Sequence, residues 1–237
     1  MRARRDIPVL RRLITVSVAA LGAGLVLAGC GSPVKLGAAA ITGDQRITQA
    51  TLDTEVTNLS QAAKLYPGTV QLSQQQEVQQ TLTWLVRFQI NDELARQAGI
   101  TVSTAQAQQA LDQIYAAAKA SAQAQGISDV TLKLILVANG IPPNLANEVG
   151  RYQAIDEQFV RQANGGTLPT SSADQTTTTN KLNQARCEAA KALNIKINPQ
   201  FGRLNYTQYA VVTMPSPVSA SPGPTKAPSQ AGLTPAC

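Results

Sequence analysis

The sequence predicts a mostly α-helical domain built around one long central helix. Two observations support this prediction. Alanine, glutamine and threonine dominate the chain, while aromatic residues make up only 4% of it. This composition favours Ala-rich helix packing over a sandwich of sheets. Apolar residues also recur at helical spacing between Gly and Pro breaks through most of the chain, as expected for a series of helices.

The central helix is expected from Ser73 to Ala98. Ser73 and Gln76 have the spacing of a capping box, which satisfies free amides at a helix start. Gly99 suits a left-handed helix end. The apolar residues spread around most of the circumference, which is typical of a buried helix. Trp84, the only tryptophan, and Leu85 are therefore expected in the core.

The other expected helices begin at polar caps and end near Gly or Pro. They run approximately from Thr48 to Tyr66, Ser103 to Gly126, Ser128 to Asn139, Asn144 to Ala163 and Asp174 to Leu193. Extended chain is expected at residues 38–42, 195–198 and 206–212. These elements form one domain over residues 38–212, and the Pro- and Ser-rich residues 213–237 are predicted to be a disordered tail.

Residues 1–29 have the order of a secretory signal peptide. Five arginines precede an apolar, small-residue stretch from Leu13 to Leu27, which is too short to be interpreted first as a membrane span. The sequence LAGC at 27–30 follows and resembles a bacterial lipobox. In lipoproteins of that kind the cysteine takes a diacylglycerol on sulfur and becomes the new N-terminus. The alternative is an ordinary signal peptide that happens to end near a cysteine.

The lipobox interpretation predicts that Cys30 is the lipidation site and that residues 30–37 are a short tether. The protein is then expected at the outer face of the cytoplasmic membrane, held there by its lipid. The chain holds 20 basic and 14 acidic residues, and 15 and 13 of these remain after residues 1–29 are removed. No basic cluster with interleaved aromatic residues remains, so a nucleic-acid partner is not expected.

Histidine-dependent catalysis is excluded because the chain contains no histidine. Neither GxxxxGK(S/T) nor GxGxxG occurs, so no phosphate-binding loop is expected. The neighbouring carboxylates Asp92-Glu93 and Asp156-Glu157 point about 100° apart on a helix and are interpreted as solvent-exposed surface. We therefore expect neither an enzyme nor a cofactor or metal site.

Two cysteines remain beside the lipidation site, Cys187 and Cys237. Outside the cytoplasmic membrane these two thiols could form a disulfide. The alternative is a free thiol at Cys187. Two thiols without histidine do not make a zinc site.

Residues 38–210 resemble the N-terminal chaperone module of SurA-like proteins, to which PrsA-type foldases and trigger factor are related. The resemblance lies in ITGDQRIT at 41–48, the long apolar helix, AGITVSTAQAQQAL at 98–111, and INPQFG at 197–202. The last of these is similar to a VNPRFG stretch of actinobacterial lipoproteins. In that family the first strand pairs with a late strand, which implies that residues 38–42 lie beside residues 195–209. Many members also carry a parvulin domain with paired histidines, which this chain lacks, so no isomerase activity is expected.

The resemblance implies a lipid-anchored, extracytoplasmic, chaperone-like protein that binds unfolded or secreted polypeptides. The helices could form an apolar groove for such clients near Tyr115, Tyr152 or Phe159, and the alternative is that these aromatic residues are core. A different function remains open, that of a structural or assembly lipoprotein that scaffolds one membrane or cell-wall partner. Capture of unfolded clients would favour the first function, and one stoichiometric partner would favour the second.

Overall fold

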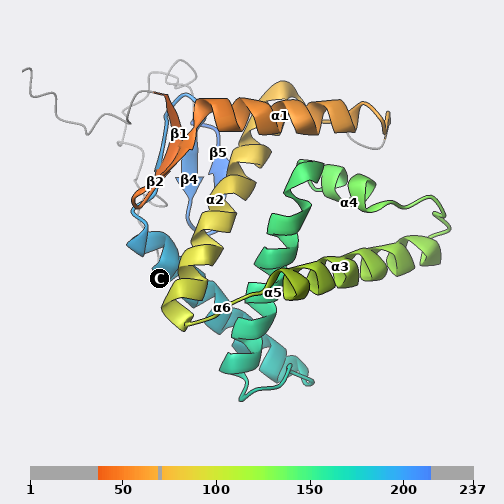
Figure 1. Cartoon of the computed structure of the whole chain (residues 1–237), viewed down its shortest axis with the longest axis vertical. Coiled ribbons are helices and arrows are strands. Elements are labelled where there is room, and N and C mark those ends of the chain that lie inside the picture. The colour runs from red at the N-terminus through yellow and green to blue at the C-terminus, as the bar shows by residue number, and fades with distance from the viewer. Residues whose placement is uncertain (1–36, 69–70, 215–237) are drawn as a thin grey trace, which may run out of the picture. The chain divides into compact units, whose positions relative to one another are not determined.

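The computed structural model describes residues 37–68 and 71–214, and these residues are mostly helical (Figure 1). Their elements are, in order, β1 (Ala38–Thr42), β2 (Gln45–Thr48), α1 (Gln49–Ala63), α2 (Gln74–Ala98), α3 (Thr104–Ala124), α4 (Leu132–Ala138), the 3-10 helix η1 (Pro143–Leu145), α5 (Ala146–Ala163), α6 (Ser172–Ala192), β3 (Lys196–Ile197), β4 (Arg203–Asn205) and β5 (Ala210–Val212). The mostly α-helical class predicted from the sequence is confirmed. None of the described helices is long and apolar enough to span a membrane.

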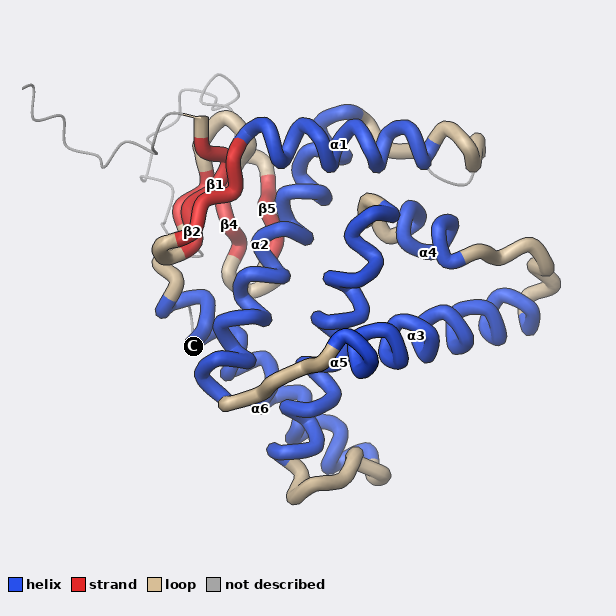
Figure 2. Tube along the Cα trace, in the orientation of Figure 1, coloured by secondary structure: helices blue, strands red, loops and turns tan. Residues whose placement is uncertain are grey.

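The strand β1 lies in the middle of a three-stranded antiparallel sheet with the order β2-β1-β3. Figure 2 shows β1 beside β2. Ala40 is opposite Ile197 of β3, and the pairing continues at Asn198. The Asn198 backbone N–H donates to the Ala39 carbonyl (2.9 Å), and its side-chain amide donates to the Ala38 carbonyl (3.0 Å). The first strand therefore pairs with a late strand, which is the arrangement that the resemblance implied.

Strands β2 and β4 were not expected as extended chain, and β5 is shorter than the run expected at 206–212. Residues 45–48 form β2, although extended chain was expected in this region only at residues 38–42, with a helix from Thr48. The late extended run at 206–212 is a turn followed by β5, which pairs with β4 in a separate two-stranded sheet. The backbone N–H of Val211 donates to Thr83 Oγ1 on α2 at 2.8 Å, so this second sheet is fastened to the central helix.

The helix α2 is central, as expected, and it contacts α1, α5, α6, β1 and β5 (Figure 1). Its capping box is present, with Gln76 N–H donating to Ser73 Oγ and Ser73 N–H donating to Gln76 Oε1. It ends at Gly99 with a φ of 66°. Its buried residues are Thr81, Leu82, Thr83, Val86, Phe88, Ile90, Asn91, Leu94 and Ala95. Trp84 and Leu85 were expected to be buried in the core, but both are only half-buried.

The largest core cluster joins one side of α2 to β1, α6 and the late strands. Leu82, Val86 and Ile90 of α2 belong to it together with Ala189 and Ala190 of α6. A second cluster joins α2 to the helices α3, α4 and α5. Its buried members are Phe88, Leu111, Leu136, Ile141, Leu145 and Val149.

Helices α3 and α5 cross with backbone close to backbone. A Cβ placed on Gly150 of α5 would lie 2.3 Å from the carbonyl oxygen of Ala107 on α3. Real Cβ atoms essentially never approach so closely, so glycine at position 150 permits this crossing.

Three helices begin at other residues than the sequence predicted. Thr131, not Ser128, caps α4, because its Oγ1 accepts from Leu134 N–H. Asn144 does not cap α5, since its side-chain amide donates to Glu55 Oε2 (2.7 Å) and the turn η1 precedes the helix. Ser171 caps α6 by accepting from Asp174 N–H.

Candidate functional site

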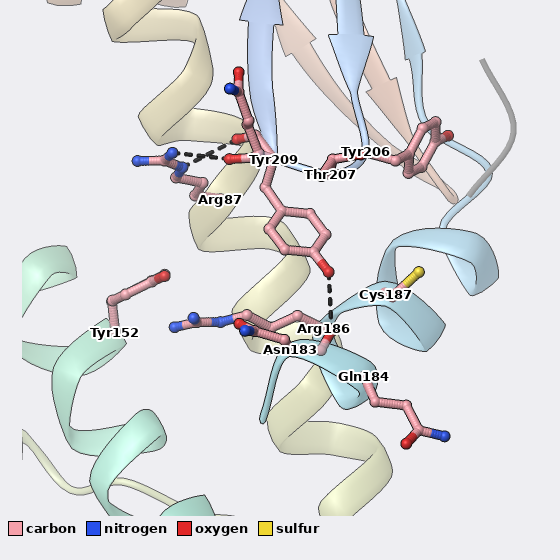
Figure 3. Close-up of a pocket in the computed structure, with 10 residues that line it drawn as sticks. Arg87, Tyr152, Asn183, Gln184, Arg186, Cys187, Tyr206, Thr207 and Tyr209 are labelled. Atoms are coloured by element: carbon pink, nitrogen blue, oxygen red, sulfur yellow. Dashed lines mark hydrogen bonds between the residues drawn. The ribbon is translucent and has the colours of Figure 1, made fainter. Parts of the chain in front are cut away.

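A cleft of about 820 Å³ lies where α2, α5 and α6 meet the turn between β4 and β5 (Figure 3). We call it the arginine cleft. It is lined by Arg87, Tyr152, Asn183, Gln184, Arg186, Cys187, Tyr206, Thr207, Gln208 and Tyr209. Its residues come from four separate elements, so the packing of the whole domain creates it.

Arg87 reaches from the middle of α2 to the β4–β5 turn. Its Nε donates to the Tyr209 carbonyl (3.0 Å) and its Nη2 donates to the Gln208 carbonyl (3.0 Å) (Figure 3). Burial lowers the pKa of Arg87 from its ordinary value, and the nearby charge of Arg186 lowers it further. This cation is therefore partly desolvated and bonded only to neutral acceptors among the described residues.

Tyr209 is held at both ends. Its φ of 47° is unusual for an aromatic residue. The carbonyl accepts from Arg87, and the hydroxyl donates to the Asn183 carbonyl on α6 at 2.9 Å (Figure 3). The turn is also supported from within, because Asn205 Oδ1 accepts from the backbone N–H of Thr207 at 2.9 Å. These bonds fix the β4–β5 turn over the cleft.

Arg186 forms a buried ion pair with Asp156 of α5. The two side chains are 15% and 13% exposed, and Arg186 Nη2 donates to Asp156 Oδ2. Burial raises the pKa of Asp156 above its ordinary value, and this effect exceeds the opposite one of Arg186. The interpretation of Asp156 as solvent-exposed surface is therefore wrong. Glu93 is also largely covered, at 11% exposed, and pairs with Arg96 on its own helix. Asp92 and Glu157 are more exposed and pair with Arg151 and Arg161, as helix-surface carboxylates commonly do.

Aromatic rings connect the two arginines. The Arg87 guanidinium carbon lies 5.1 Å from the centre of the Trp84 ring, and that of Arg186 lies 5.0 Å from the Tyr152 ring. Trp84 and Tyr152 are themselves in edge contact, with 6.0 Å between ring centres. Both distances to the guanidinium groups are within the range of cation–π attraction. The arrangement holds two cations beside flat apolar surfaces.

The lining of the arginine cleft is rich in hydrogen-bond donors and contains no carboxylate. Burial raises the pKa of Tyr152, Tyr206 and Tyr209, so these phenols keep their protons at neutral pH. Within the described part of the chain, no group of three or more Cys, His, Asp or Glu side chains could hold a metal ion. Chemically, the cleft suits a ligand that brings carbonyl or carboxylate oxygens and an apolar side chain.

Comparison of the sequence with family models and curated proteins, and of the fold with solved structures, gives no match. The geometry of the cleft is therefore the basis for a functional proposal.

The three aromatic residues predicted for a client groove lie in different surroundings. Tyr152 lines the arginine cleft. Phe159 packs against the large core cluster on α2, so the alternative interpretation as core fits it better. The Tyr115 hydroxyl donates to the Val130 carbonyl (3.2 Å) in the connection between α3 and α4. The structure does not bring these three residues into one groove.

Of the predicted cysteine sites, only Cys187 is among the described residues. It is buried and disulfide-bonded, so a free thiol is not present. On α6 its sulfur points away from Arg186 and Tyr152 (Figure 3). Cys30 and Cys237 lie outside the described residues, so lipidation at Cys30 and pairing of Cys187 with Cys237 stay predictions.

The sequence analysis missed Arg87 and Arg186 as site residues. Arg87 did carry a signal, because it is the one charged residue in the stretch TLTWLVRFQI at 81–90 of a helix expected to be buried. A lone charge at such a position needs a partner or a ligand. Arg186 carried none, because its importance depends on Asp156 of another helix.

Proposed function

We propose that this chain is a lipid-anchored, extracytoplasmic, chaperone-like protein that holds unfolded or secreted polypeptides, with the arginine cleft as a contact surface. The observation that carries the proposal is the lining of the cleft, which combines two arginines and three tyrosines without a carboxylate. The resemblance of residues 38–210 to SurA-like chaperone modules supports the same function.

The lining is suited to polypeptides of varied sequence. Backbone carbonyls are present in every polypeptide, and the guanidinium, phenol and amide groups of the cleft can donate to them. Aromatic rings offer large apolar contact at a low cost in side-chain entropy. Asn183, Thr207 and Gln208 are exposed at the cleft and add polar groups there. Such a surface favours broad recognition over one shape-matched ligand.

Anchoring rests on the order of the first 30 residues. A positive region, an apolar stretch and LAGC at 27–30 support export followed by lipidation of Cys30. The lipidated chain would then present the domain at the outer face of the cytoplasmic membrane, where secreted polypeptides emerge unfolded. Cys30→Ala should abolish labelling by a radioactive fatty acid, and unchanged labelling would contradict this assignment.

The test is a holding assay with the lipidated protein in nanodiscs. A chemically denatured test protein is diluted into buffer, and its aggregation is followed by light scattering. The protein should slow aggregation in proportion to its concentration, relative to empty nanodiscs. It should leave the cis/trans relaxation of an Xaa-Pro peptide at its uncatalysed rate, about tens of seconds or longer. An absence of holding, with one stoichiometric partner recovered from membranes, would favour the scaffold function instead.

A further inference from the structure

We infer that the arginine cleft selects acidic segments, so that the preferred clients are polypeptides in which a carboxylate lies near an aromatic or aliphatic side chain. This inference rests on the proposed function and names the chemistry that the cleft prefers among polypeptides. It follows from the charges of the cleft, from the free donors of Arg87 and from the position of the aromatic rings.

The charges of the site do not cancel. Arg186 has its own counterion in Asp156, and the two are buried together. Arg87 has no such counterion among the described residues, because its two hydrogen bonds go to the neutral carbonyls of Gln208 and Tyr209. A partly desolvated cation with only neutral partners leaves an uncompensated positive charge in the cleft, and a bound carboxylate would neutralise it.

Arg87 also has donors to offer. A guanidinium carries five N–H donors in a planar fork, and its bonds to the β4–β5 turn use two of them. The remaining three have no hydrogen-bond partner among the described residues. These bonds also hold the guanidinium in place, so little side-chain entropy is lost when an anion binds. A planar carboxylate matches this geometry and can accept two parallel bonds.

The aromatic rings decide between an acidic polypeptide and a simple anion. Trp84 lies beside Arg87, and Tyr152 lies between Trp84 and Arg186. Tyr152 lines the cleft, so a carboxylate bound to Arg87 there has an aromatic ring within reach for the side chain next to it. Inorganic phosphate or a lipid headgroup would use the charge but leave these rings without an apolar partner. The combination favours an acidic residue with an apolar neighbour.

The direct test measures binding of three labelled peptides to the lipidated protein in nanodiscs. The first contains Glu beside Leu and Phe and has an amidated C-terminus. The second replaces each Glu with Gln, and the third is the Gln peptide with a free C-terminal carboxylate. Fluorescence anisotropy gives affinity, and the emission of Trp84, the only tryptophan in the chain, reports occupancy next to Arg87.

The Glu peptide should bind about tenfold or more tightly than its amidated Gln counterpart, the loss expected for a charge-assisted pair. The preference should shrink as salt is raised. Binding of the free-carboxylate Gln peptide at the affinity of the Glu peptide would identify the terminal carboxylate as an equally good ligand and would support the inference. Equal binding of all three peptides would overturn it while leaving the proposed function standing. If none binds and holding is also absent, the proposed function fails as well.

Single arginine variants test where the carboxylate of the Glu peptide binds. Arg87→Gln should remove most of the preference for Glu, whereas Arg161→Gln, which deletes the same charge from an exposed pair on α5, should leave it intact. Arg87→Lys keeps the charge without the planar fork and should keep part of the preference, with the fold checked by circular dichroism. Displacement of the Glu peptide by millimolar phosphate or by anionic vesicles, with no peptide preference, would indicate a general anion site and contradict the inference.

Discussion

On one side of α2, Leu82, Val86 and Ile90 are buried among aliphatic side chains. On another side, half-buried Arg87 lines the arginine cleft and lies against the half-buried Trp84 ring. The first side is covered by β1, α6 and the late strands. There Asn198 bonds to Ala38 of β1, 160 positions away in the sequence. The second side faces a cleft with two cations, flat rings and donors. One helix therefore serves as the centre of the core and as a wall of the candidate site, and the side chains divide these roles.

The comparison shows where the domain can bury charged groups at a cost in folding free energy. The aliphatic side buries apolar surface and is held by strand pairing between distant segments. This stability allows the cleft side to keep a partly desolvated arginine and a buried ion pair, neither of which stabilises a fold by itself. The following predictions test this division between a stabilising side and a cleft side.

The largest effect is expected from breaking the buried ion pair. Asp156→Ala leaves the Arg186 guanidinium buried without its counterion, which should lower the free energy of unfolding by about 3–5 kcal/mol. Urea unfolding followed by circular dichroism measures this loss. The double variant Asp156→Asn with Arg186→Gln keeps a neutral pair of similar shape and should recover most of the stability. A loss below about 1 kcal/mol for Asp156→Ala would mean that water reaches the pair.

A comparable loss is expected on the aliphatic side of α2. Leu82 is fully buried, so Leu82→Ala should cost about 2–5 kcal/mol by the same measurement. Leu85 is half-buried on the same helix and provides a matched control, for which about 1 kcal/mol is expected. Equal losses for the two variants would show that Leu85 is packed as tightly as Leu82 against the same core cluster.

A smaller effect is expected at high pH. Burial raises the pKa of Tyr152 above its ordinary value of 10.0. The phenol therefore loses its proton at lower pH in the unfolded chain than in the folded one, and the folded state keeps more protons between the two pKa values. The stability that Tyr152 contributes is fully present below pH 10 and is lost as pH rises through the raised pKa.

Tyr152→Phe removes this titration while keeping the ring beside Arg186. Urea unfolding at a series of pH values from about 9 to 11 should then show a shallower decline for the variant than for the natural protein, by about 1 kcal/mol or less. Identical declines would mean that Tyr152 is as well hydrated in the folded protein as in the unfolded chain. Tyr206 and Tyr209 have raised pKa values for the same reason and account for part of the remaining decline.

The sequence predicted best what depends on neighbouring residues. The capping boxes at Ser73 and Ser103 and the helix end at Gly99 are present, because each needs only residues three or four positions apart. Asn144 had the signature of a cap, but its side chain bonds to Glu55 of another helix, 89 positions away. A local pattern cannot indicate that a distant partner competes for the same side chain.

The arginine cleft could not be predicted for the same reason. Arg87, Tyr152, Arg186 and Tyr209 come from three helices and a turn, and apart from the Arg87–Trp84 contact the partners that define the site are distant in sequence. Asp156 was interpreted as exposed because it and Glu157 are adjacent carboxylates on a helix and point about 100° apart. Its burial depends on α6 packing across α5, which periodicity within one helix does not reveal.

The central claim is that varied polypeptides contact the arginine cleft, and site-specific crosslinking in cells that export the protein tests it most directly. A photoreactive amino acid replaces Thr207 at the cleft or, as a control, Gln123, which is exposed on α3 away from the cleft lining. Crosslinking at Thr207 should give many products of different mass, identified as secreted or membrane polypeptides rich in acidic segments, and Gln123 should give few. One discrete product at Thr207, or equal patterns at the two positions, would contradict the account.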